Sequence, residues 1–489
     1  MNESKNDIGI VGLAVMGRSL VLNMADHGFA VAAFNRTFSV TQEFAAELGP
    51  GQRVEPCYSL EQFVGSLRKP RRVMIMVKAG RPVDAVISEL EGLLEPGDVL
   101  IDGGNSHFKD TERREQHLAA KGISFLGVGI SGGEFGARTG PSIMPGGAQE
   151  AYELVRPIFE TIAARVDGEP CVALMGPGAA GHYVKMVHNG IEYGLMQLIA
   201  ESYALMKQAL GLTNEELAEV YADWDAAELS SYLVEITARI FRRRDDKTGG
   251  YLIDLIRGEA GQLGTGMWTS QSAMDLQTPV PNIDIAVSMR NLSALEEQRR
   301  AAAHLLGSAA SGGETASGAP RQGEDPSGTG RLKIEHVRDA LYAGMMITYA
   351  QGFALLQAAS AALGFGLTLE DVASVWRGGC IIRSALLCDV KAAFQRQPGS
   401  PNLLLDPDLS RTVASRRESL VRAVEAGAGT GVAVPGLMTS LAYVDAYRAE
   451  WLPSNLIQAQ RDYFGAHTYR RIDQDGIFHT DWLAGQAGS

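Results

Sequence analysis

The first 178 residues alternate short β-rich runs with amphipathic helical stretches, and this alternation constrains the fold more than any other feature of the sequence. The runs are IGIVG, VAAFN, VMIMV, VLIDGG and ISFLGVGIS. Apolar strands that alternate with helices predict βαβ units in a parallel sheet. From about residue 180 onward long helical periods dominate, as in GIEYGLMQLIAESYALMKQAL. We therefore expect an α/β domain followed by a large helical region.

The chain is long enough to hold several compact regions, because 489 residues with 45% hydrophobic content can bury more than one core. We expect a dinucleotide-binding domain over 1–178, a helical domain over 179–450 and a C-terminal tail over 451–489. The stretch 307–330 is rich in Gly, Ser and Pro, which predicts a flexible surface loop. The tail mixes aromatic residues, arginines and turn residues without a long helical period, so we expect a partner surface to order it.

Composition argues against several classes of protein. A net charge of −13 opposes a nucleic-acid partner, because such partners are held by a basic surface. The apolar runs are shorter than the about 20 residues that span a bilayer, and the charged start MNESKNDIGIVG lacks the pattern of a secretion signal. We therefore expect no membrane anchor and a cytoplasmic location. No C-x-x-C pair supports a zinc site or a disulfide framework among Cys57, Cys171, Cys380 and Cys388.

A glycine turn near the N-terminus points to a bound dinucleotide. The segment IGIVGLAVMGRSLVLNMADHGFAVAAFNRT reads as strand, turn, helix and strand, with Gly12, Ala14 and Gly17 in the turn. Gly12 permits the tight turn, Ala14 lets the backbone approach a pyrophosphate, and Gly17 lets the helix pack on the strand. The helix N-terminus then offers N–H groups to the phosphates. Any strand-to-helix turn can contain glycines, but the second strand that follows favours cofactor binding over a purely structural turn.

The residues after the second strand bear on which dinucleotide binds. This strand ends in Asn35, Arg36 and Thr37, where an NAD-selective fold commonly places an acidic residue. A guanidinium can bond a 2′-phosphate through two N–H groups, whereas a carboxylate would repel it. The alternative is a solvated arginine on a loop. We expect NADP as the cofactor.

The segment GHYVKMVHNGIEYGLMQLI carries four polar residues at helical spacing. They stand at i, i+3, i+4 and i+7, which places them on one face of a helix. These residues are Lys185, His188, Asn189 and Glu192. Apolar residues cover much of the rest of the helix, so this polar stripe is expected to line a cavity. The alternative is a solvated face that carries the lysine and the glutamate.

The polar stripe suits a reaction with separate base and acid steps. A lysine shielded from water has a lowered pKa and accepts a proton near neutral pH. Glu192 supplies a second, separate proton donor. We therefore expect Lys185 and Glu192 to be catalytic, without a metal.

A second polar cluster is expected at the carboxyl ends of two strands, where open α/β sheets bind ligands. Asn105 follows the strand that ends in IDGGNS, and Ser131 precedes Gly132 and Gly133 at the end of another. These glycines can be plain turn formers. Asn105 and Ser131 add hydrogen-bonding groups that suit a carboxylate or hydroxyls.

Through these and other motifs the sequence resembles the decarboxylating 6-phosphogluconate dehydrogenases, almost from end to end. The family-like motifs are GLAVMG, NRT, VKAG, IDGGNS, GPSIMPGG, KMVHNGIEY, NLLLD and NLIQAQRDYFGAHTY. The resemblance implies a Rossmann-type domain, a large all-α domain and a small sugar acid as substrate. It also implies a homodimer in which the C-terminal tail reaches into the partner subunit.

The resemblance implies roles for single residues as well. Lys185 resembles the base that takes the proton from the C3 hydroxyl while a hydride passes to the nicotinamide, and Glu192 resembles the acid that protonates C1 of the enediol. The implied cofactor-binding residues are Gly12, Ala14, Val15, Met16, Gly17, Asn35, Arg36, Thr37, Val77, Lys78, Ala79 and Asn105. The implied substrate-binding residues are Asn105, Ser131, Gly132, Gly133, His188, Asn189, Tyr193, Thr265, Arg290, Arg461 and His467.

One segment departs from the family pattern at the phosphate end of the substrate. The family usually reads GQKGTGKW, whereas this chain reads GQLGTGMW, with Leu263 and Met267 in place of the lysines. A charge-assisted hydrogen bond contributes about 1.5–3 kcal/mol, so the loss of one would weaken phosphate binding about tenfold or more. Leu195 and Phe135 also stand where acidic residues are common in the family.

Three hypotheses about function follow. The first is NADP-dependent oxidative decarboxylation of 6-phosphogluconate to ribulose 5-phosphate and CO2, a step of the pentose phosphate pathway. The second keeps this chemistry for a different or non-phosphorylated sugar acid, because Leu263 and Met267 replace the lysines. The third is a catalytically inactive binding or scaffolding protein, against which the intact Lys185, Glu192 and glycine turn argue.

Overall fold

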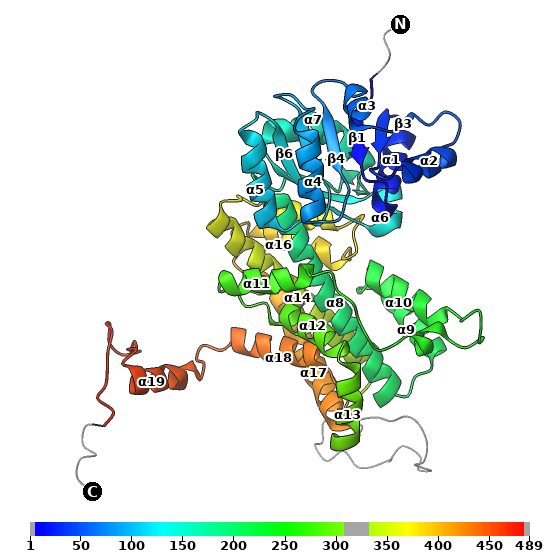
Figure 1. Cartoon of the computed structure of the whole chain (residues 1–489). Helices are drawn as coiled ribbons and strands as arrows, with labels where there is room; N and C mark the ends of the chain where they lie inside the picture. Colours follow the sequence, from blue (N-terminus) through cyan, green and yellow to red (C-terminus); the bar gives the residue numbers. More distant parts are fainter. Residues whose placement is uncertain (1–4, 308–331, 484–489) are drawn as a thin grey trace. The chain divides into compact units, whose positions relative to one another are not determined.

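The computed structural model describes residues 5–307 and 332–483, so nearly all of the predicted loop 307–330 lies outside the described residues. The chain divides into two compact units, Met1–Ser440 and Leu441–Ser489. Figure 1 labels the helices and strands along the chain. The prediction of an α/β region followed by a helical region is confirmed within the larger unit.

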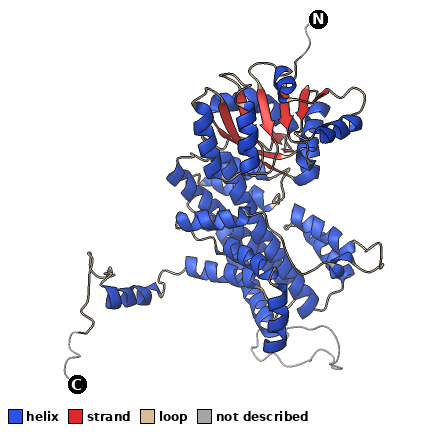
Figure 2. Cartoon of the chain, viewed as in Figure 1, coloured by secondary structure: helices blue, strands red, loops and turns tan. Residues whose placement is uncertain are grey.

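A seven-stranded sheet forms the centre of the α/β region, with the strand order β3-β2-β1-β4-β5-β6-β7. Strands β1 to β6 are parallel, whereas β7 pairs with β6 in the antiparallel direction. Figure 2 shows this sheet among the helices that cover it. The strands of this sheet are β1 (Ile8–Val11), β2 (Val31–Phe34), β3 (Val54–Cys57), β4 (Arg72–Ile75), β5 (Val99–Asp102), β6 (Ser124–Ser131) and β7 (Ser142–Gly147), and β8 (Arg165–Val166) and β9 (Glu169–Pro170) form a separate pair.

Alternate side chains of the strands face two apolar cores, because successive residues of a strand point to opposite faces. Met74 belongs to one core, and its neighbours Val73 and Ile75 belong to the other. The first core takes most of its helical residues from α1 (Val15–Asp26) and α7 (Gln149–Ile162). The helices over the second core are α3 (Leu60–Gly65), α4 (Arg81–Leu90) and α5 (Phe108–Ala119).

Two long helices, α8 (Ala180–Ala204) and α14 (Ile334–Leu363), form the centre of the helical region and pack against each other. Both are buried over most of their length, as expected for helices that are apolar nearly all round. No helix among the described residues is long and apolar enough to cross a membrane. The remaining helices are α2 (Phe38–Glu47), α6 (Gly133–Thr139), α9 (Asn214–Asp225), α10 (Tyr232–Arg242), α11 (Thr265–Asp275), α12 (Pro281–Ser293), α13 (Glu296–Leu306), α15 (Leu369–Trp376), α16 (Leu386–Arg396), α17 (Pro407–Thr430), α18 (Pro435–Tyr447) and α19 (Ser454–Gly465), with single turns η1 (Leu205–Ala209), η2 (Leu252–Leu255) and η3 (Leu403–Leu405).

Two strands of the sheet lie outside the five predicted runs. These are β3, which reads VEPC, and β7, which reads SIMPGG. Proline and glycine disfavour strands, and both strands lie at an edge of the sheet, where proline is tolerated. The proposed domain boundary at 178/179 stays a prediction, because the sheet and the helices that follow it lie within one compact unit.

The smaller unit contains a helix that the residue pattern of the tail does not predict, α19 (Ser454–Gly465). Asp462 of this helix is fully buried and its carboxylate holds the following loop. Burial by itself raises the pKa of Asp462, but the hydrogen bonds that it accepts outweigh burial and lower this pKa to about 2. The donors are Thr468 N at 2.9 Å, His479 Nδ1 at 2.9 Å, Thr480 N at 3.0 Å and Trp482 Nε1 at 2.8 Å.

Candidate active site

The predicted glycine turn lies between β1 and α1, and its geometry requires the glycines. Gly12 has a φ of 106°, and a Cβ atom there would lie 2.5 Å from the carbonyl oxygen of Met76. A Cβ atom on Gly17 would lie 1.9 Å from the carbonyl oxygen of Gly12. Side chains at these two positions would therefore push α1 away from β1 and from the turn after β4.

The N-terminus of α1 opens on a cavity of about 1090 Å³ that is lined by Ala14, Val15 and Asn35, among others. Ala14 is the N-cap residue, and its side chain accepts no hydrogen bond, so the first N–H groups of α1 are available to an anion. The side-chain oxygen of Asn35 accepts a hydrogen bond from the N–H of Leu13 at 3.1 Å, which fixes the turn. Met16, in the first turn of α1, is half-buried.

A second cavity of about 160 Å³ is lined by Arg36, Thr37 and Val77, among others. Arg36 is exposed and forms no hydrogen bond or ion pair within the described part of the chain. An unpaired guanidinium beside the glycine turn fits a 2′-phosphate. Lys78 and Ala79 follow in the turn after β4, with Lys78 exposed. The residues of both cavities therefore fit a phosphorylated dinucleotide.

The polar stripe of α8 is buried, as its spacing predicts. Lys185 is 6% exposed, His188 is 0% exposed, Asn189 is 9% exposed, and Glu192 is half-buried. The Nζ of Lys185 donates to the side-chain oxygen of Asn189 and lies 3.3 Å from Nδ1 of His188. A carboxylate oxygen of Glu192 lies 3.9 Å from the same Nδ1. Within residues 5–307 and 332–483, no carboxylate forms an ion pair with Lys185.

Burial controls the protonation of this stripe. It lowers the pKa of Lys185, and the charge of Glu192 opposes this shift. Burial, followed by the charge of Lys185, holds the pKa of His188 well below its ordinary value. Burial raises the pKa of Glu192, while Lys185 and Arg290 act in the opposite direction. The lysine is thus shifted toward the neutral amine and the glutamate toward the protonated acid, the forms that a base and an acid need.

Two glycines of β6 let α8 approach the sheet closely. A Cβ atom on Gly127 would lie 2.9 Å from Nδ1 of His182, and one on Gly129 would lie 2.4 Å from Cβ of Lys185. Alternate residues of a strand face the same side, and residues three apart on a helix do likewise. The pair of glycines therefore seats His182 and Lys185 directly on β6.

The predicted residues at the carboxyl ends of the strands surround the stripe. Ser131 ends β6, and its Oγ lies 3.2 Å from Nε2 of His188. Gly132 and Gly133 follow with φ values of 122° and 61°. Asn105 lies exposed after β5. It lines a narrow cleft together with Lys185, Thr265 and Trp268.

Tyr193 and Arg290 contact each other next to the polar stripe, and Thr265 lines the cleft beside Lys185. The guanidinium carbon of Arg290 lies 3.5 Å from the centre of the Tyr193 ring. Thr265 is buried at the start of α11. Leu263 is 92% exposed and Met267 is 40% exposed, so both apolar replacements face solvent. Arg290 is the one cation among the predicted phosphate contacts in the described residues of the larger unit.

Arg461 and His467 belong to the smaller unit and are both exposed. The Nη1 of Arg461 donates to the side-chain oxygen of Gln458 at 3.1 Å. Their contribution to the substrate site stays a prediction.

A group of buried polar residues beside the stripe belongs to no predicted site. It includes His182, Thr111 and Arg114. A signal for His182 is present, because it stands three residues before Lys185 and so shares its helix face. Arg114 carries a local signal as well, because it lies four residues before the apolar Leu118 on the buried face of α5, whereas Arg113 lies outside this face.

Two family descriptions match this chain, one after the other. Residues 7–176 match the NAD binding domain of 6-phosphogluconate dehydrogenase. Residues 181–482 match the C-terminal domain of 6-phosphogluconate dehydrogenase. Together the two matches span nearly the whole chain.

Curated relatives and a solved structure agree with these matches. The chain is 52% identical to the NADP(+)-dependent, decarboxylating 6-phosphogluconate dehydrogenase of Bacillus subtilis, over 98% of this chain and 100% of that protein. It is 50% identical to the decarboxylating 6-phosphogluconate dehydrogenase of Escherichia coli K12, with the same coverage. The Plasmodium falciparum 6-phosphogluconate dehydrogenase, solved alone and with NADP+ or 6-phosphogluconate, is similar with a TM-score of 0.91 and 41% identity, over 97% of this chain and 100% of that chain.

Proposed function

The chain belongs to the 6-phosphogluconate dehydrogenase family, and on this premise we propose that Lys185 and Glu192 are the base and the acid of its reaction. The protein is an NADP-dependent oxidoreductase that converts 6-phosphogluconate to ribulose 5-phosphate and CO2. The observation that carries the assignment is the burial of Lys185 without a carboxylate partner in the described residues, beside the residues that end β5 and β6.

The first step is the oxidation of C3 of the sugar acid. The neutral amine of Lys185 takes the proton of the C3 hydroxyl, and the hydrogen on C3 leaves with its electron pair. The residues of the glycine turn would hold NADP, which would supply the acceptor for this hydride. The side-chain oxygen of Asn189 accepts a hydrogen bond from Lys185 and so keeps its Nζ in place. The product is a 3-keto acid.

The second step is the loss of CO2. The bond between C1 and C2 breaks, and its electron pair remains on C2 and the neighbouring keto oxygen. Lys185, now an ammonium, stabilises that negative charge at close range. Glu192 then donates its proton to the carbon that becomes C1 of the product, for which its raised pKa prepares it.

Other predicted residues hold the substrate in this proposal. The sugar acid contacts Asn105, Ser131, Gly132, Gly133, His188 and Asn189. Its phosphate contacts Tyr193, Thr265 and Arg290 of one subunit and Arg461 and His467 of the other.

We also propose a homodimer with exchange of the C-terminal tail. The apolar side chains Leu456, Ile457 and Phe464 of α19 are 61%, 59% and 73% exposed, and a second copy would cover them. A cytoplasmic location accords with the free thiols of the four cysteines, the state that a reducing compartment maintains.

Mixed dimers test the exchange of the tail. Lys185→Met and Arg461→Ala are each expected to be nearly inactive. Co-expressed in equal amounts, they should recover about a quarter of wild-type activity, because half of the dimers are mixed and each mixed dimer has one intact site. Recovery no greater than the sum of the two separate variants would show that each tail serves its own subunit.

The reaction itself is tested by the substrate that makes the purified protein release CO2 and form NADPH. We expect a large preference for 6-phosphogluconate over gluconate, measured as kcat/KM. The exposed Leu263 favours a second candidate, the same chemistry on a non-phosphorylated sugar acid. Equal kcat/KM values for the two acids would select that second candidate.

The choice of cofactor is tested at Arg36, which lies free beside the smaller cavity in the described structure. Arg36→Ala should raise the KM for NADP about tenfold or more, because a charge-assisted contact to the 2′-phosphate is lost. The KM for NAD should change little. An equal rise for both cofactors would contradict the assigned contact.

A further inference from the structure

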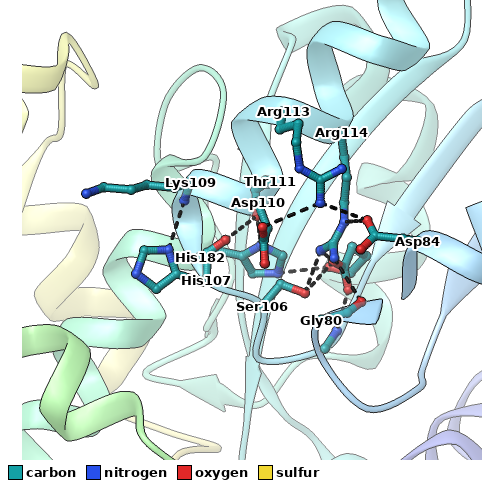
Figure 3. A network of polar contacts seen from close by, with 12 residues as sticks. Gly80, Asp84, Ser106, His107, Lys109, Asp110, Thr111, Arg113, Arg114 and His182 are labelled. Carbon is teal, nitrogen blue, oxygen red and sulfur yellow. Dashed lines mark hydrogen bonds and ion pairs between the residues drawn. The ribbon is translucent and has the colours of Figure 1, made fainter. Parts of the chain in front are cut away.

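A single buried arginine joins four groups beside the active site. Arg114 of α5 has a side chain that is 1% exposed, and all three of its guanidinium nitrogens donate hydrogen bonds. Figure 3 shows this network around Asp84, Ser106 and Gly80. The acceptors are Asp84 Oδ1 at 2.8 Å, Asp102 Oδ2 at 3.2 Å, Ser106 Oγ at 3.1 Å and the carbonyl oxygen of Gly80 at 3.0 Å.

Asp84 lies in the first turn of α4, and the other three acceptors border or lie in two loops that carry predicted cofactor and substrate residues. Gly80 ends the turn after β4, which contains Lys78. Asp102 ends β5, and Ser106 lies in the following loop, which contains Asn105. Arg114 therefore connects the cofactor-side loop with the substrate-side loop through direct hydrogen bonds.

Asp102 shapes the substrate-side loop on both sides of Asn105. Its Oδ1 accepts a hydrogen bond from the N–H of Gly104 at 3.1 Å, and its Oδ2 accepts one from Ser106 Oγ at 2.6 Å. The side chain of Asp102 is 0% exposed, so Arg114 is needed to balance its charge. The position of Asn105 is thus set by a buried ion pair.

The same network reaches the helix that carries the base. Nε2 of His182 lies 3.1 Å from the carbonyl oxygen of Asp102, and its Nδ1 lies 2.7 Å from Oγ1 of Thr111. Burial lowers the pKa of His182, so the neutral ring donates through Nε2 to the carbonyl and accepts from Thr111 through Nδ1. His182 stands one helical turn before Lys185 and thereby ties α8 to the end of β5.

We propose that Arg114 is a positioning residue for the reaction, which holds the loops after β4 and β5 at the spacing that aligns cofactor and sugar acid with Lys185. This inference rests on the proposed function. Arginine suits the task because its rigid fork reaches two carboxylates, a hydroxyl and a carbonyl at once, which a lysine cannot do. A purely stabilising ion pair would leave the kinetic constants of the folded protein unchanged.

The chain offers a matched control in the neighbouring residue. Arg113 also donates to Asp84, at 2.9 Å, but its side chain is 58% exposed and contacts neither Asp102 nor Ser106. Arg113→Met should therefore keep kcat and both KM values within about twofold of wild type, since exposed ion pairs contribute little. Arg114→Met should lower kcat/KM about 100-fold, because displacements of about 1 Å have effects of this size.

The readouts separate positioning from stability. For soluble, folded Arg114→Met we expect a lower kcat and raised KM values for both NADP and 6-phosphogluconate, with an unchanged pH profile of kcat. Compared with Arg114→Met, Arg114→Lys should be more soluble, whereas its kcat/KM should rise much less. Wild-type kcat and KM values in folded Arg114→Met, with only a lower Tm, would overturn the proposal.

If Arg114→Met does not fold, a milder variant tests the positioning role of Arg114. Ser106→Ala keeps the ion pair and removes one hydroxyl from the loop, so kcat/KM should fall about tenfold. An unchanged kcat/KM in Ser106→Ala would then overturn the proposal. If the wild type forms no NADPH, the proposed function fails instead, and NADPH binding measured by fluorescence becomes the test. Arg114→Met or Ser106→Ala should weaken that binding, and unchanged affinity in both would overturn the positioning role.

Discussion

His182 and Lys185 lie one helical turn apart on α8, yet they belong to buried polar groups of opposite character. Around His182, the charges of Arg114 and Asp102 meet directly, and every guanidinium nitrogen has an acceptor. Around Lys185, the nearest groups are the neutral side chains of Asn189 and His188. Burial alone therefore does not decide the chemistry of a side chain.

The difference shows how one helix can carry both a residue that stabilises the structure and a residue that exchanges a proton. A buried charge with a partner is fixed, because breaking the pair leaves the partner's charge uncompensated. A buried charge without a partner shifts its pKa toward the neutral form and so exchanges a proton readily. The proposed roles follow this division: the paired charges near His182 hold the geometry, and the unpaired Lys185 exchanges the proton.

The largest expected effect comes from removing the reactive amine. Lys185→Met should lower kcat by about 1000-fold or more, because base catalysis contributes factors of this order. The affinity for NADP should stay close to wild type, because Lys185 lies outside both cavities of the cofactor. Stopped-flow assays of NADPH formation and fluorescence titration measure the two quantities. Retained turnover would remove Lys185 from the mechanism and with it the contrast between the two groups.

The next effect comes from the acid. Glu192→Gln should lower kcat about 100-fold, since the proposed proton donor for the enediol is lost. The charge of Glu192 also opposes the lowering of the Lys185 pKa, so its removal should let that pKa fall further. The neutral amine then persists to lower pH, and the acidic limb of the kcat/KM profile should move to lower pH. A shift to higher pH would contradict the proposed coupling.

A pair of methionine variants should change stability in opposite directions. Arg114→Met leaves the buried Asp102 without a partner and should destabilise the protein by about 3–5 kcal/mol. Lys185→Met removes a buried, unpaired charge and should raise the Tm slightly. Below its lowered pKa the buried amine destabilises the fold fully, and this effect fades as the pH rises toward the value of 10.5 of a free lysine. Thermal unfolding at pH 6.5 and 9.5 measures the Tm change of each variant. Tm changes of the same sign in Arg114→Met and Lys185→Met would refute the distinction between paired and unpaired buried charges.

The smallest expected effect comes from adding a positive charge at position 263, where this chain has a leucine. Leu263 is 92% exposed near the predicted phosphate contacts, so a longer polar side chain fits without disturbing the core. Leu263→Lys should lower the KM for 6-phosphogluconate about tenfold through one charge-assisted contact. The KM for gluconate should not change, and an equal decrease for both acids would show that the added lysine does not contact the phosphate.

Much of this arrangement could be predicted from local patterns. The glycine turn, five strands and the four-residue stripe of α8 follow from spacing and apolar periodicity. The edge strands β3 and β7 could not, because proline and glycine weaken their local signal and pairing with a neighbour decides their state. The partners of Arg114 could not either, since the fold brings Asp102 and Gly80 to it from other segments of the chain.

Asp462 stabilises the conformation of the C-terminal segment through hydrogen bonds within that segment. Four donors from residues 468 to 482 converge on this one carboxylate. In the proposed homodimer, a segment that is already folded loses little conformational freedom when it binds the partner subunit, so most of the free energy from burying Leu456 and Ile457 would hold the two subunits together. The strength of the assembly would then be set within this segment, before the subunits meet.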